Sequence, residues 1–268
     1  MAVDNLVEVT KLRKEFGGLV ATDDVDFVIP RGSIVALIGP NGAGKTTFFN
    51  QLTGVYSPTS GSILFDGTEV VHLPPHAITA LGVGRTFQNI RLFAQMSAVE
   101  NVLVGMHCRL QGGIIGSILR TRKVKREEEE ARDRARELLT YSGLPRRHDD
   151  RAGNLPYGDQ RRLEVARALA TEPKLLLLDE PTAGMNPQET AEFTAFVRRV
   201  RDDKGLTVLL IEHDMKVVMG VSERITVLEY GAKIAEGSAA EIQSDERVIE
   251  AYLGKGAAAR MMAGGANA

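Results

Sequence analysis

The sequence predicts an α/β protein with a mixed sheet at its core, an antiparallel β region near the N-terminus and a helical region in the middle. Three observations predict this fold class. An apolar run, Ser33–Ile38, precedes a glycine-rich turn and a helix. Strand signals disappear from about residue 89 to 153, and apolar strands then alternate with helices again. We therefore expect one domain over residues 5–254, with residues 89–153 as its helical subdomain.

Short apolar segments joined by turn residues predict strands in the N-terminal region. The segments are VEVTKL, VDFVIP and SIVALI, and the last is continuous enough to be buried on both faces. A helix over KTTFFNQLTG ends at Gly54, because glycine is favoured just past a helix C-terminus. The segment GSILFDGTEVV predicts a hairpin with Asp66-Gly67 at its turn.

Two helices are predicted in the middle region. The first, SAVENVLVGMHCRL, begins with a capping box of Ser97 and Glu100. The second, TRKVKREEEEARDRARELLTYSG, has a basic start that suggests a phosphate or lipid surface, but a solvated face balanced by the glutamates is the favoured interpretation. Between them, QGGIIGSILR predicts an apolar loop or short helix, a candidate contact surface for a partner. The apolar stripe of the second helix comprises Ala131, Ala135, Leu138 and Leu139.

Strands and helices alternate in the C-terminal part. The strands are KLLLLDE, GLTVLLIEHD and ERITVLEYG, separated by helices over residues 187–203 and 215–221. Parallel strands joined by crossover helices are the expected architecture. The Gly/Ala-rich segment 255–268 is expected to be a poorly ordered tail.

Composition narrows the class of protein. The formal net charge is −2, which gives no global basic field to recruit nucleic acid. One cysteine, Cys108, excludes an internal disulfide and favours a reducing compartment. The first residues do not resemble a signal peptide, and no apolar run reaches the roughly 18 residues of a membrane span. We expect a soluble cytoplasmic protein that reaches a membrane only through a partner.

A phosphate-binding loop is predicted at GPNGAGKTT, residues 39–47. Gly42 and Gly44 let the backbone turn sharply and approach phosphate oxygens. Successive N–H groups and a helix N-terminus then face the anion. Lys45 is placed to bridge the β- and γ-phosphates, and the Thr46 hydroxyl is placed to bind Mg²⁺.

An acidic pair, Asp179 and Glu180, ends the apolar strand in KLLLLDEP, where ligands of open α/β sheets collect. One carboxylate can hold Mg²⁺ through its water shell, and the other can orient and deprotonate an attacking water. Two solvated surface acids are the alternative interpretation. The phosphate loop in the same chain favours the catalytic one.

Three further residues are candidates for the site. His213 ends a strand that we expect to lie beside the phosphate-loop strand, which would put the histidine within reach of a γ-phosphate. The alternative is that His213 is a structural or surface residue. Gln88 lies where a strand ends and the helical region begins, a position suited to sensing Mg²⁺ and the attacking water. Phe16 is placed to stack on adenine, with a core phenylalanine as the alternative.

With these segments in this order, the chain resembles the ATP-binding subunit of an ABC transporter over about residues 5–254. The matching motifs are GPNGAGKTT, Gln88, the loop 155–160, LLLLDEPTAG and His213. In that family two cassettes close head to tail, and each ATP lies between one phosphate loop and the signature loop of the other cassette. The resemblance implies catalytic roles for Glu180, His213 and Gln88, a Mg²⁺ site of Thr46, Gln88 and Asp179, and ATP contacts from Phe16, Gly39, Pro40, Asn41, Gly42, Ala43, Gly44, Lys45, Thr46, Thr47, Leu155, Pro156, Tyr157, Gly158, Asp159 and Gln160.

The sequence departs from the common family pattern at two places. The usual Leu-Ser-Gly-Gly-Gln signature is Leu-Pro-Tyr-Gly-Asp here, and the usual Leu-Asp after the acidic pair is Met185-Asn186. Pro156 loses the serine hydroxyl, whereas Gly158 still permits close backbone approach, so we expect the loop to act through its backbone and the helix dipole. These variants, together with the segment GVGRTFQNIRLF and the long insertion through GGIIGSILRTRKVKREEEEA, are similar to the subgroup that serves high-affinity importers of branched-chain amino acids. Importers of urea, amides or short peptides and a lipopolysaccharide exporter have similar cassettes.

The resemblance implies a second ATPase subunit, membrane permease subunits at the cytoplasmic face of the cell membrane and, indirectly, a periplasmic or extracellular substrate-binding protein. ATP binding would close the cassette dimer and hydrolysis would reopen it, with residues 89–153 passing the motion to the permease. A soluble ABC protein acting on DNA or ribosomes is a rival, disfavoured by the single cassette and the slightly acidic balance. A regulatory ATP-binding module without turnover is another, which Glu180 and His213 disfavour.

Overall fold

The computed structural model describes residues 4–109 and 122–254. The chain divides into two compact units, one formed by the residues up to Pro75 together with those from Thr190 onward, the other by His76–Glu189. The predicted apolar segment 111–120 and the predicted tail 255–268 lie outside the described residues.

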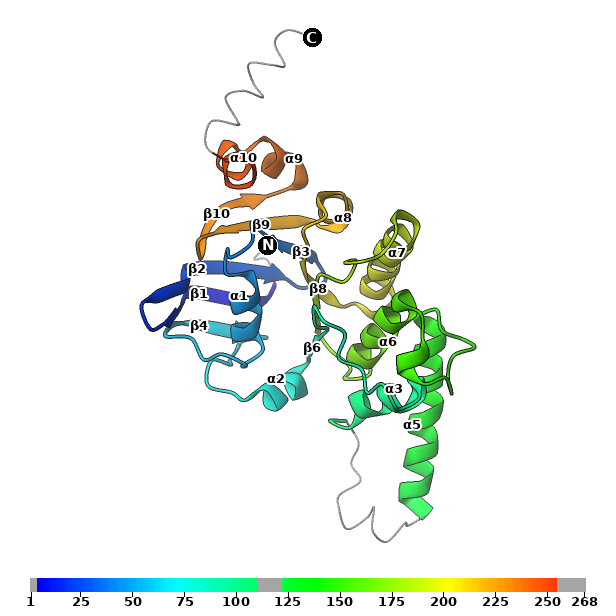
Figure 1. Cartoon of the computed structure of the whole chain (residues 1–268). Helices are drawn as coiled ribbons and strands as arrows, with labels where there is room; N and C mark the ends of the chain where they lie inside the picture. The colour runs from blue at the N-terminus through cyan, green and yellow to red at the C-terminus, as the bar shows by residue number, and fades with distance from the viewer. Residues whose placement is uncertain (1–3, 110–121, 255–268) are drawn as a thin grey trace. The chain divides into compact units, whose positions relative to one another are not determined.

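The first unit contains a four-stranded antiparallel sheet in the order β2-β1-β4-β5 (Figure 1). Its strands are β1 (Asn5–Phe16), β2 (Leu19–Pro30), β4 (Ser60–Phe65) and β5 (Thr68–Glu69). The predicted hairpin is confirmed, since β4 pairs with β5 across Asp66 and Gly67. Both turn residues have positive φ, 50° and 75°, as a tight two-residue turn requires.

The first unit also contains the parallel strands that carry the phosphate loop. The strand β3 (Ile34–Ile38) pairs in parallel with both β8 (Thr207–Ile211) and β9 (Arg224–Glu229), and β9 pairs antiparallel with β10 (Ala232–Gly237). All five residues of β3 are buried, which explains its unbroken apolar sequence. The helices of this part are α1 (Lys45–Leu52), α7 (Pro187–Lys204), α8 (Met215–Val221), α9 (Ala239–Ser244) and α10 (Glu246–Leu253).

The second unit combines a parallel strand pair with helices. The strands β6 (Val83–Arg85) and β7 (Leu175–Asp179) run parallel. The helices are α2 (Pro75–Leu81), α3 (Ala98–Met106), α5 (Arg122–Tyr141), the 3₁₀ turn η1 (Ala152–Asn154) and α6 (Tyr157–Leu169). Figure 1 shows α3, α5 and α6 together, and their facing residues form one buried apolar cluster.

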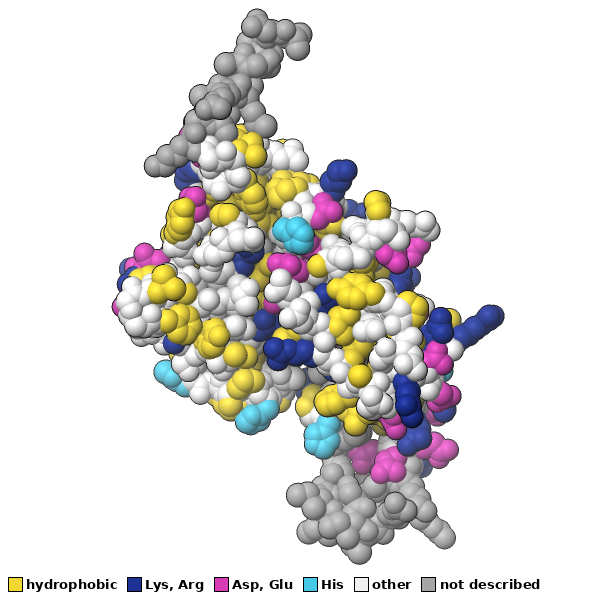
Figure 2. Space-filling model, in the orientation of Figure 1, with side chains coloured by type: hydrophobic (Ala, Val, Ile, Leu, Met, Phe, Trp, Pro, Cys, Tyr) yellow, Lys and Arg dark blue, Asp and Glu magenta, His cyan; other side chains and the backbone are white. Residues whose placement is uncertain are grey.

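The sequence patterns of the helical region are confirmed. Ser97 and Glu100 form the predicted capping box at the start of α3. The stripe on α5 packs into the cluster, with Ala131, Ala135 and Leu139 buried and Leu138 half-buried. The other face of α5 carries exposed acidic and basic side chains, which are intermixed in Figure 2. That mixture supports a solvated face.

Most predicted strands and helices match the structure. The sequence did not predict the short helices α2, α9 and α10 or the strand β10. The strand before Gln88 ends at Arg85, three residues earlier than the expected position. None of the helices in the described part of the chain combines the length and apolar character that a bilayer-spanning segment needs.

Gly105→Ala is expected to destabilise the protein, because a Cβ on Gly105 in α3 would stand 2.3 Å from the carbonyl oxygen of Arg167 in α6. The two helices must separate to accept it, and such overpacking costs about 1–3 kcal/mol. Gly220→Ala in α8 is the control, since its Cβ meets nothing within 4 Å among the described residues. Urea unfolding measures both changes, and a wild-type midpoint for Gly105→Ala would contradict the expected clash.

Candidate functional site

The phosphate loop follows β3 and runs into α1, as predicted. At two positions of the loop only glycine fits, because a neighbouring backbone carbonyl occupies the space that a Cβ would need. A Cβ on Gly39 would lie 2.1 Å from the carbonyl oxygen of Leu228, and one on Gly44 would lie 2.2 Å from that of Ala21. Gly42 has a φ of 81°, a backbone conformation that residues other than glycine rarely adopt. At Gly39 and Gly44 the loop therefore packs directly against the backbone of β9 and β2, which leaves no room for a side chain at either position.

Lys45 lies over this loop. Its Nζ donates hydrogen bonds to the carbonyl oxygens of Gly39, at 2.7 Å, and Pro40, at 3.0 Å. Thr46 and Thr47 follow in the first turn of α1, with Thr46 exposed. The geometry thus places an ammonium group, two hydroxyls and the N-terminal N–H groups of a helix on one short segment, which suits a phosphate chain.

Tyr252 of α10 also reaches this loop, which the sequence did not predict. Burial raises the pKa of its phenol, and the backbone N–H of Gly39 opposes the rise by donating a hydrogen bond to the phenol oxygen. A tyrosine from a helix near the C-terminus thus contacts the first glycine of the phosphate loop.

Phe16 ends β1 and is 41% exposed, so it is not a core residue. Its ring meets that of Tyr56 edge to face, with 5.3 Å between centroids. The Lys14 ammonium stands 4.9 Å from the centroid of Phe16. The sequence identified Phe16 but not Tyr56, although the two rings form one exposed aromatic platform.

His213 follows β8, and β8 pairs directly with β3, so the predicted neighbourhood of its strand and the phosphate-loop strand is confirmed. The side chain is 66% exposed, with its Nδ1 3.8 Å from the buried carboxylate of Glu212. Glu212 also accepts a hydrogen bond from the His213 backbone N–H. This neighbouring acid is a second residue that the sequence did not single out.

In the second unit, Asp179 is the last residue of β7 and is 3% exposed. Its Oδ2 lies 3.1 Å from Nη2 of Arg85, which is the last residue of β6. Burial raises the pKa of the Asp179 carboxyl above its ordinary value, while the Arg85 guanidinium opposes the rise. The sequence predicted the acid but not its buried cation.

Glu180 has a φ of 46°, an unusual backbone conformation for a residue with a side chain. Strained backbone of this kind is concentrated at functional sites. Gln88 donates a hydrogen bond from Nε2 to Glu180 Oε2 at 3.0 Å. The structure therefore brings two of the three predicted catalytic residues into direct contact.

The predicted signature segment spans the start of α6. Leu155 is buried in the helical cluster, Pro156 takes the N-cap position, and Tyr157 begins the helix and is 45% exposed. Gln160 donates to the Leu155 carbonyl at 2.8 Å, and Asp159 lies 3.6 Å from Nε of Arg147. The loop is thus anchored at Leu155 and exposed at Pro156 and Tyr157, two of the three residues that depart from the family pattern, while the third, Asp159, is half-buried.

Asn186 precedes α7. Its Oδ1 accepts hydrogen bonds from the backbone N–H groups of Gln188 and Glu189, both at 3.0 Å. It therefore caps the helix as the usual aspartate would, without the negative charge.

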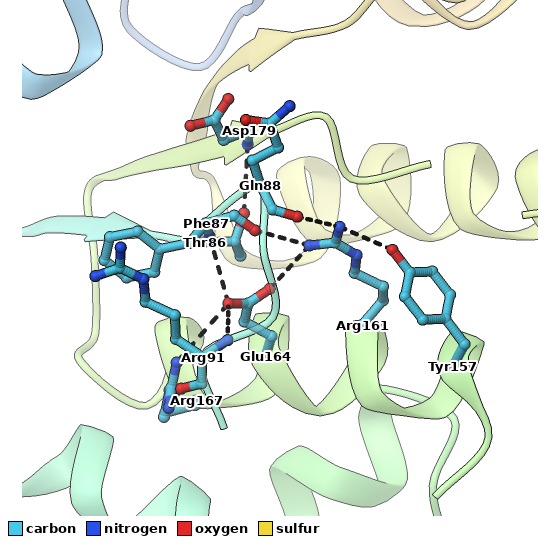
Figure 3. Close-up of polar contacts among 9 residues, drawn as sticks. All are labelled: Thr86, Phe87, Gln88, Arg91, Tyr157, Arg161, Glu164, Arg167 and Asp179. Carbon is cyan, nitrogen blue, oxygen red and sulfur yellow. Dashed lines mark hydrogen bonds and ion pairs between the residues drawn. The ribbon is translucent and has the colours of Figure 1, made fainter. Parts of the chain in front are cut away.

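A polar network joins the segment after β6 to α6 (Figure 3). Arg161 and Glu164 form a buried ion pair at 3.2 Å. Burial raises the pKa of Glu164, while N–H groups and arginines around it oppose the rise. The sequence did not single out either residue, because a charged pair three positions apart on a helix rich in charged residues resembles an ordinary exposed pair.

The described units carry different parts of the predicted site. The first unit holds Phe16, the phosphate loop 39–47 and His213, and the second holds Gln88, the acidic pair and residues 155–160.

Two family models match the chain. Residues 22–183 match the model described as ABC transporter, and residues 232–258 match the one described as branched-chain amino acid ATP-binding cassette transporter. The chain is 47% identical over 250 residues to the high-affinity branched-chain amino acid transport ATP-binding protein BraF of Pseudomonas aeruginosa, which covers 93% of this chain and 98% of that protein. The high-affinity branched-chain amino acid transport ATP-binding protein LivG of Escherichia coli has the same identity and coverage. The lipopolysaccharide export system ATP-binding protein LptB of Escherichia coli is 34% identical, and the match covers 91% of this chain and 95% of LptB.

Solved structures of ATP-binding cassettes have the same fold as this chain. A crystal structure of a nucleotide-free ATP-binding cassette from an ABC transporter matches with a TM-score of 0.82 and 30% identity over 94% of this chain and all of that one. Another cassette, in its ADP conformation, matches with a TM-score of 0.81 and 30% identity over 94% of this chain and 99% of that one. The fold class predicted from the sequence is confirmed.

Arg85→Met is expected to make stability strongly pH-dependent. Burial makes folded Asp179 hold its proton more tightly than the unfolded chain does, so its contribution to stability falls as pH rises through the folded-state pKa. Without Arg85 that pKa rises further, and the charged carboxylate at pH 8 has lost its buried partner. The free energy of unfolding should then fall by about 3–5 kcal/mol relative to wild type at pH 8, and by less at pH 5.

Urea unfolding at the two pH values measures this difference. Arg147→Met is the control, because the 3.0 Å ion pair of Arg147 with Asp150 is largely exposed and such pairs contribute about 1 kcal/mol or less. An equal loss for Arg85→Met at both pH values would show that Asp179 does not respond to Arg85.

Proposed function

The chain belongs to the ABC transporter ATP-binding family, and from this premise we propose that it is the ATP-hydrolysing subunit of a membrane importer for branched-chain amino acids. One observation gives the main support for branched-chain amino acids as the substrate class. Residues 232–258 match a model specific to branched-chain amino acid cassettes, and they include β10, α9 and α10. The 47% identity to BraF and LivG, against 34% to the exporter subunit LptB, supports the same class.

The proposed chemistry uses the phosphate loop, Glu180 and Gln88. Lys45 and the backbone of the phosphate loop bind the phosphates of ATP. Glu180 orients and deprotonates the attacking water, and Gln88, which donates to it at 3.0 Å, holds that carboxylate in place. A positioned base of this kind accelerates a reaction by about 10²–10⁴-fold. The remainder of phosphoryl transfer depends on positioning and electrostatics.

The residues assigned to Mg²⁺ suit that ion, because a hydroxyl, an amide oxygen and a carboxylate are hard oxygen ligands. These residues are Thr46, Gln88 and Asp179. The Gln88 amide donates through its nitrogen, so its oxygen is the group suited to a cation. Asp179 shares one carboxylate oxygen with Arg85, which favours a contact through water. Bound Mg²⁺ would neutralise charge on the β- and γ-phosphates.

The signature segment 155–160 acts on the ATP of a second cassette in this proposal. ATP binding closes the dimer and hydrolysis reopens it. Residues 89–153 pass the movement to permease subunits, which places the protein at the cytoplasmic face of the cell membrane. A substrate-binding protein outside the membrane delivers the amino acid.

Glu180→Gln is expected to stop hydrolysis and transport together. The variant keeps the shape of the side chain but cannot accept the proton of water, so steady-state phosphate release should fall by about 10²-fold or more. ATP should remain bound and the closed dimer should accumulate. The measurements are phosphate release and radiolabelled leucine uptake by the transporter reconstituted in proteoliposomes.

Glu8→Gln is the matched control, because Glu8 is exposed on β1, outside residues 89–153 and the predicted site. It should leave both rates unchanged. Near-normal hydrolysis by Glu180→Gln would refute the role as base. Uptake of urea or a peptide, with none of leucine, isoleucine or valine, would refute the substrate class.

Gly158→Ala separates a role in the dimer from a role within one chain. Inside its own chain the added Cβ has room, since the nearest atom is the Oε1 of Glu189 at 3.7 Å. Stability should therefore be kept or raised by about 0.5–1 kcal/mol. Turnover should fall by about tenfold to 100-fold, because the methyl group meets the ATP of the second subunit. ATPase assays and urea unfolding on the same preparation test this, and unchanged turnover would rule out close approach at Gly158.

A further inference from the structure

The segment that follows β6, residues 86–93, forms no helix or strand. We call it the Gln88 loop. Its backbone groups lack the partners that regular structure would supply, yet buried backbone N–H and C=O groups need hydrogen bonds. At its ends, the Thr86 N–H donates to the Leu177 carbonyl, and the Asn101 side chain of α3 binds both backbone groups of Phe93. Between Phe87 and Arg91 the partners are charged side chains of α6.

Arg161 supplies the donors. Its Nη1 donates to the carbonyl oxygen of Phe87 at 2.7 Å, and its Nη2 donates to the carbonyl oxygen of Gln88 (Figure 3). The planar guanidinium thus holds two consecutive peptide units. A fork of donors in fixed geometry sets direction as well as distance, which a single ammonium group does not.

Glu164 and Arg167 bind three more backbone groups of the loop. Glu164 Oε1 accepts from the backbone N–H groups of Phe87 and Arg91, both at 3.4 Å. Arg167 donates from Nη1 to the Arg91 carbonyl at 2.6 Å. Five backbone groups between Phe87 and Arg91 therefore bind three side chains one turn apart on a single helix.

This arrangement is costly as a source of stability. The side chains of Arg161 and Glu164 are 3% and 1% exposed, and removing two charges from water costs several kcal/mol each before their attraction is counted. The buried Nε of Arg161 has no hydrogen-bond partner among the described residues. An apolar pair would avoid this penalty but would leave the backbone groups that Arg161 and Glu164 bind without those partners. What the charged pair adds is a defined position for the loop.

Tyr157 connects the same guanidinium to the start of α6. Its hydroxyl accepts from Arg161 Nη2 at 3.0 Å, and its ring lies 5.4 Å from the guanidinium carbon. The ring also borders Gly184, where a Cβ would stand 3.4 Å from it. Tyr157 is 45% exposed, so an approaching group at the signature segment can reach it.

We propose that Tyr157, Arg161 and Glu164 form a positioning relay, which holds the Gln88 loop so that the Gln88 amide meets the Glu180 carboxylate. The inference rests on the proposed function, because it assigns Glu180 to hydrolysis. The relay makes one end of α6 sensitive to contacts at the signature segment and transmits a change there to the water-activating carboxylate of the same cassette. Tyr157, which replaces a glycine of the common signature, is the exposed end of the relay.

A double-mutant cycle tests the relay, because residues that act through one contact show non-additive effects. Arg161→Lys keeps the charge but loses the fork that holds two carbonyls. It should lower kcat of the full-length protein by about tenfold to 100-fold, with the KM for ATP within about twofold of wild type. In a Gln88→Ala background the same change should have no further effect on kcat, measured by single-turnover phosphate release where turnover is slow. An equal loss in both backgrounds would overturn the relay.

Tyr157→Phe gives an independent test in a variant that keeps the exposed ring and removes only the hydroxyl. We expect a fall in kcat of about threefold, an unchanged urea midpoint and no further effect in the Gln88→Ala background. Arg162→Lys, half-buried on the same helix, is the control and should leave kcat within about twofold of wild type. Wild-type kcat for Tyr157→Phe, in a protein that folds normally, would also overturn the proposal.

These outcomes are distinct from failure of the proposed function. If wild-type protein hydrolyses ATP and Glu180→Gln does not, the function stands and the cycle decides the relay alone. If Glu180→Gln hydrolyses ATP normally, the proposed role of Glu180 fails whatever the cycle shows.

Discussion

Backbone groups that leave helices and strands must still find hydrogen-bond partners, and this requirement determines how each candidate functional loop of the protein is held. At the phosphate loop, Lys45 binds the carbonyl oxygens of Gly39 and Pro40. At the Gln88 loop, Arg161 and its neighbours on α6 bind five backbone groups. Before α7, Asn186 caps the first N–H groups of the helix. In each case a side chain takes the place of a missing strand or helical turn.

The same contacts place charge where the proposed chemistry needs it. Arg85 lies against Asp179 and opposes the rise of its pKa on burial, which helps keep a carboxylate available beside a cation. Gln88 fixes one oxygen of Glu180. An ion pair as buried as that of Arg85 and Asp179 is stronger than one in water, and loss of one partner is correspondingly costly. Single changes in the polar groups of the second unit should therefore be costly. The apolar cluster of α3, α5 and α6 depends instead on how well its side chains fill the space between the helices.

The features that were predicted correctly from the sequence are those that depend on residues close together in the chain. The phosphate loop, the acidic pair and the capping box of α3 are each encoded within a few positions, so their spacing alone identified them. Contacts between distant segments had no such local signal. Gln88 and Glu180 are 92 residues apart, and the ring of Tyr56 meets Phe16 only because β1 and the segment after α1 fold together. The short helices α1 and α8 were predicted because a phosphate-loop motif or an apolar strand precedes each of them, whereas α10 has no such marker and too few residues for a clear period.

The way in which α6 binds the Gln88 loop also bears on how this segment can change in evolution. Arg161, Glu164 and Arg167 contact peptide groups of the loop, which every residue other than proline presents in the same form. Replacement of the side chains at positions 89 and 90 leaves those groups in place. Insertion or deletion of one residue between Phe87 and Arg91 would move the carbonyl and N–H groups out of register with a rigid helix. The loop should therefore accept many different sequences but only one length.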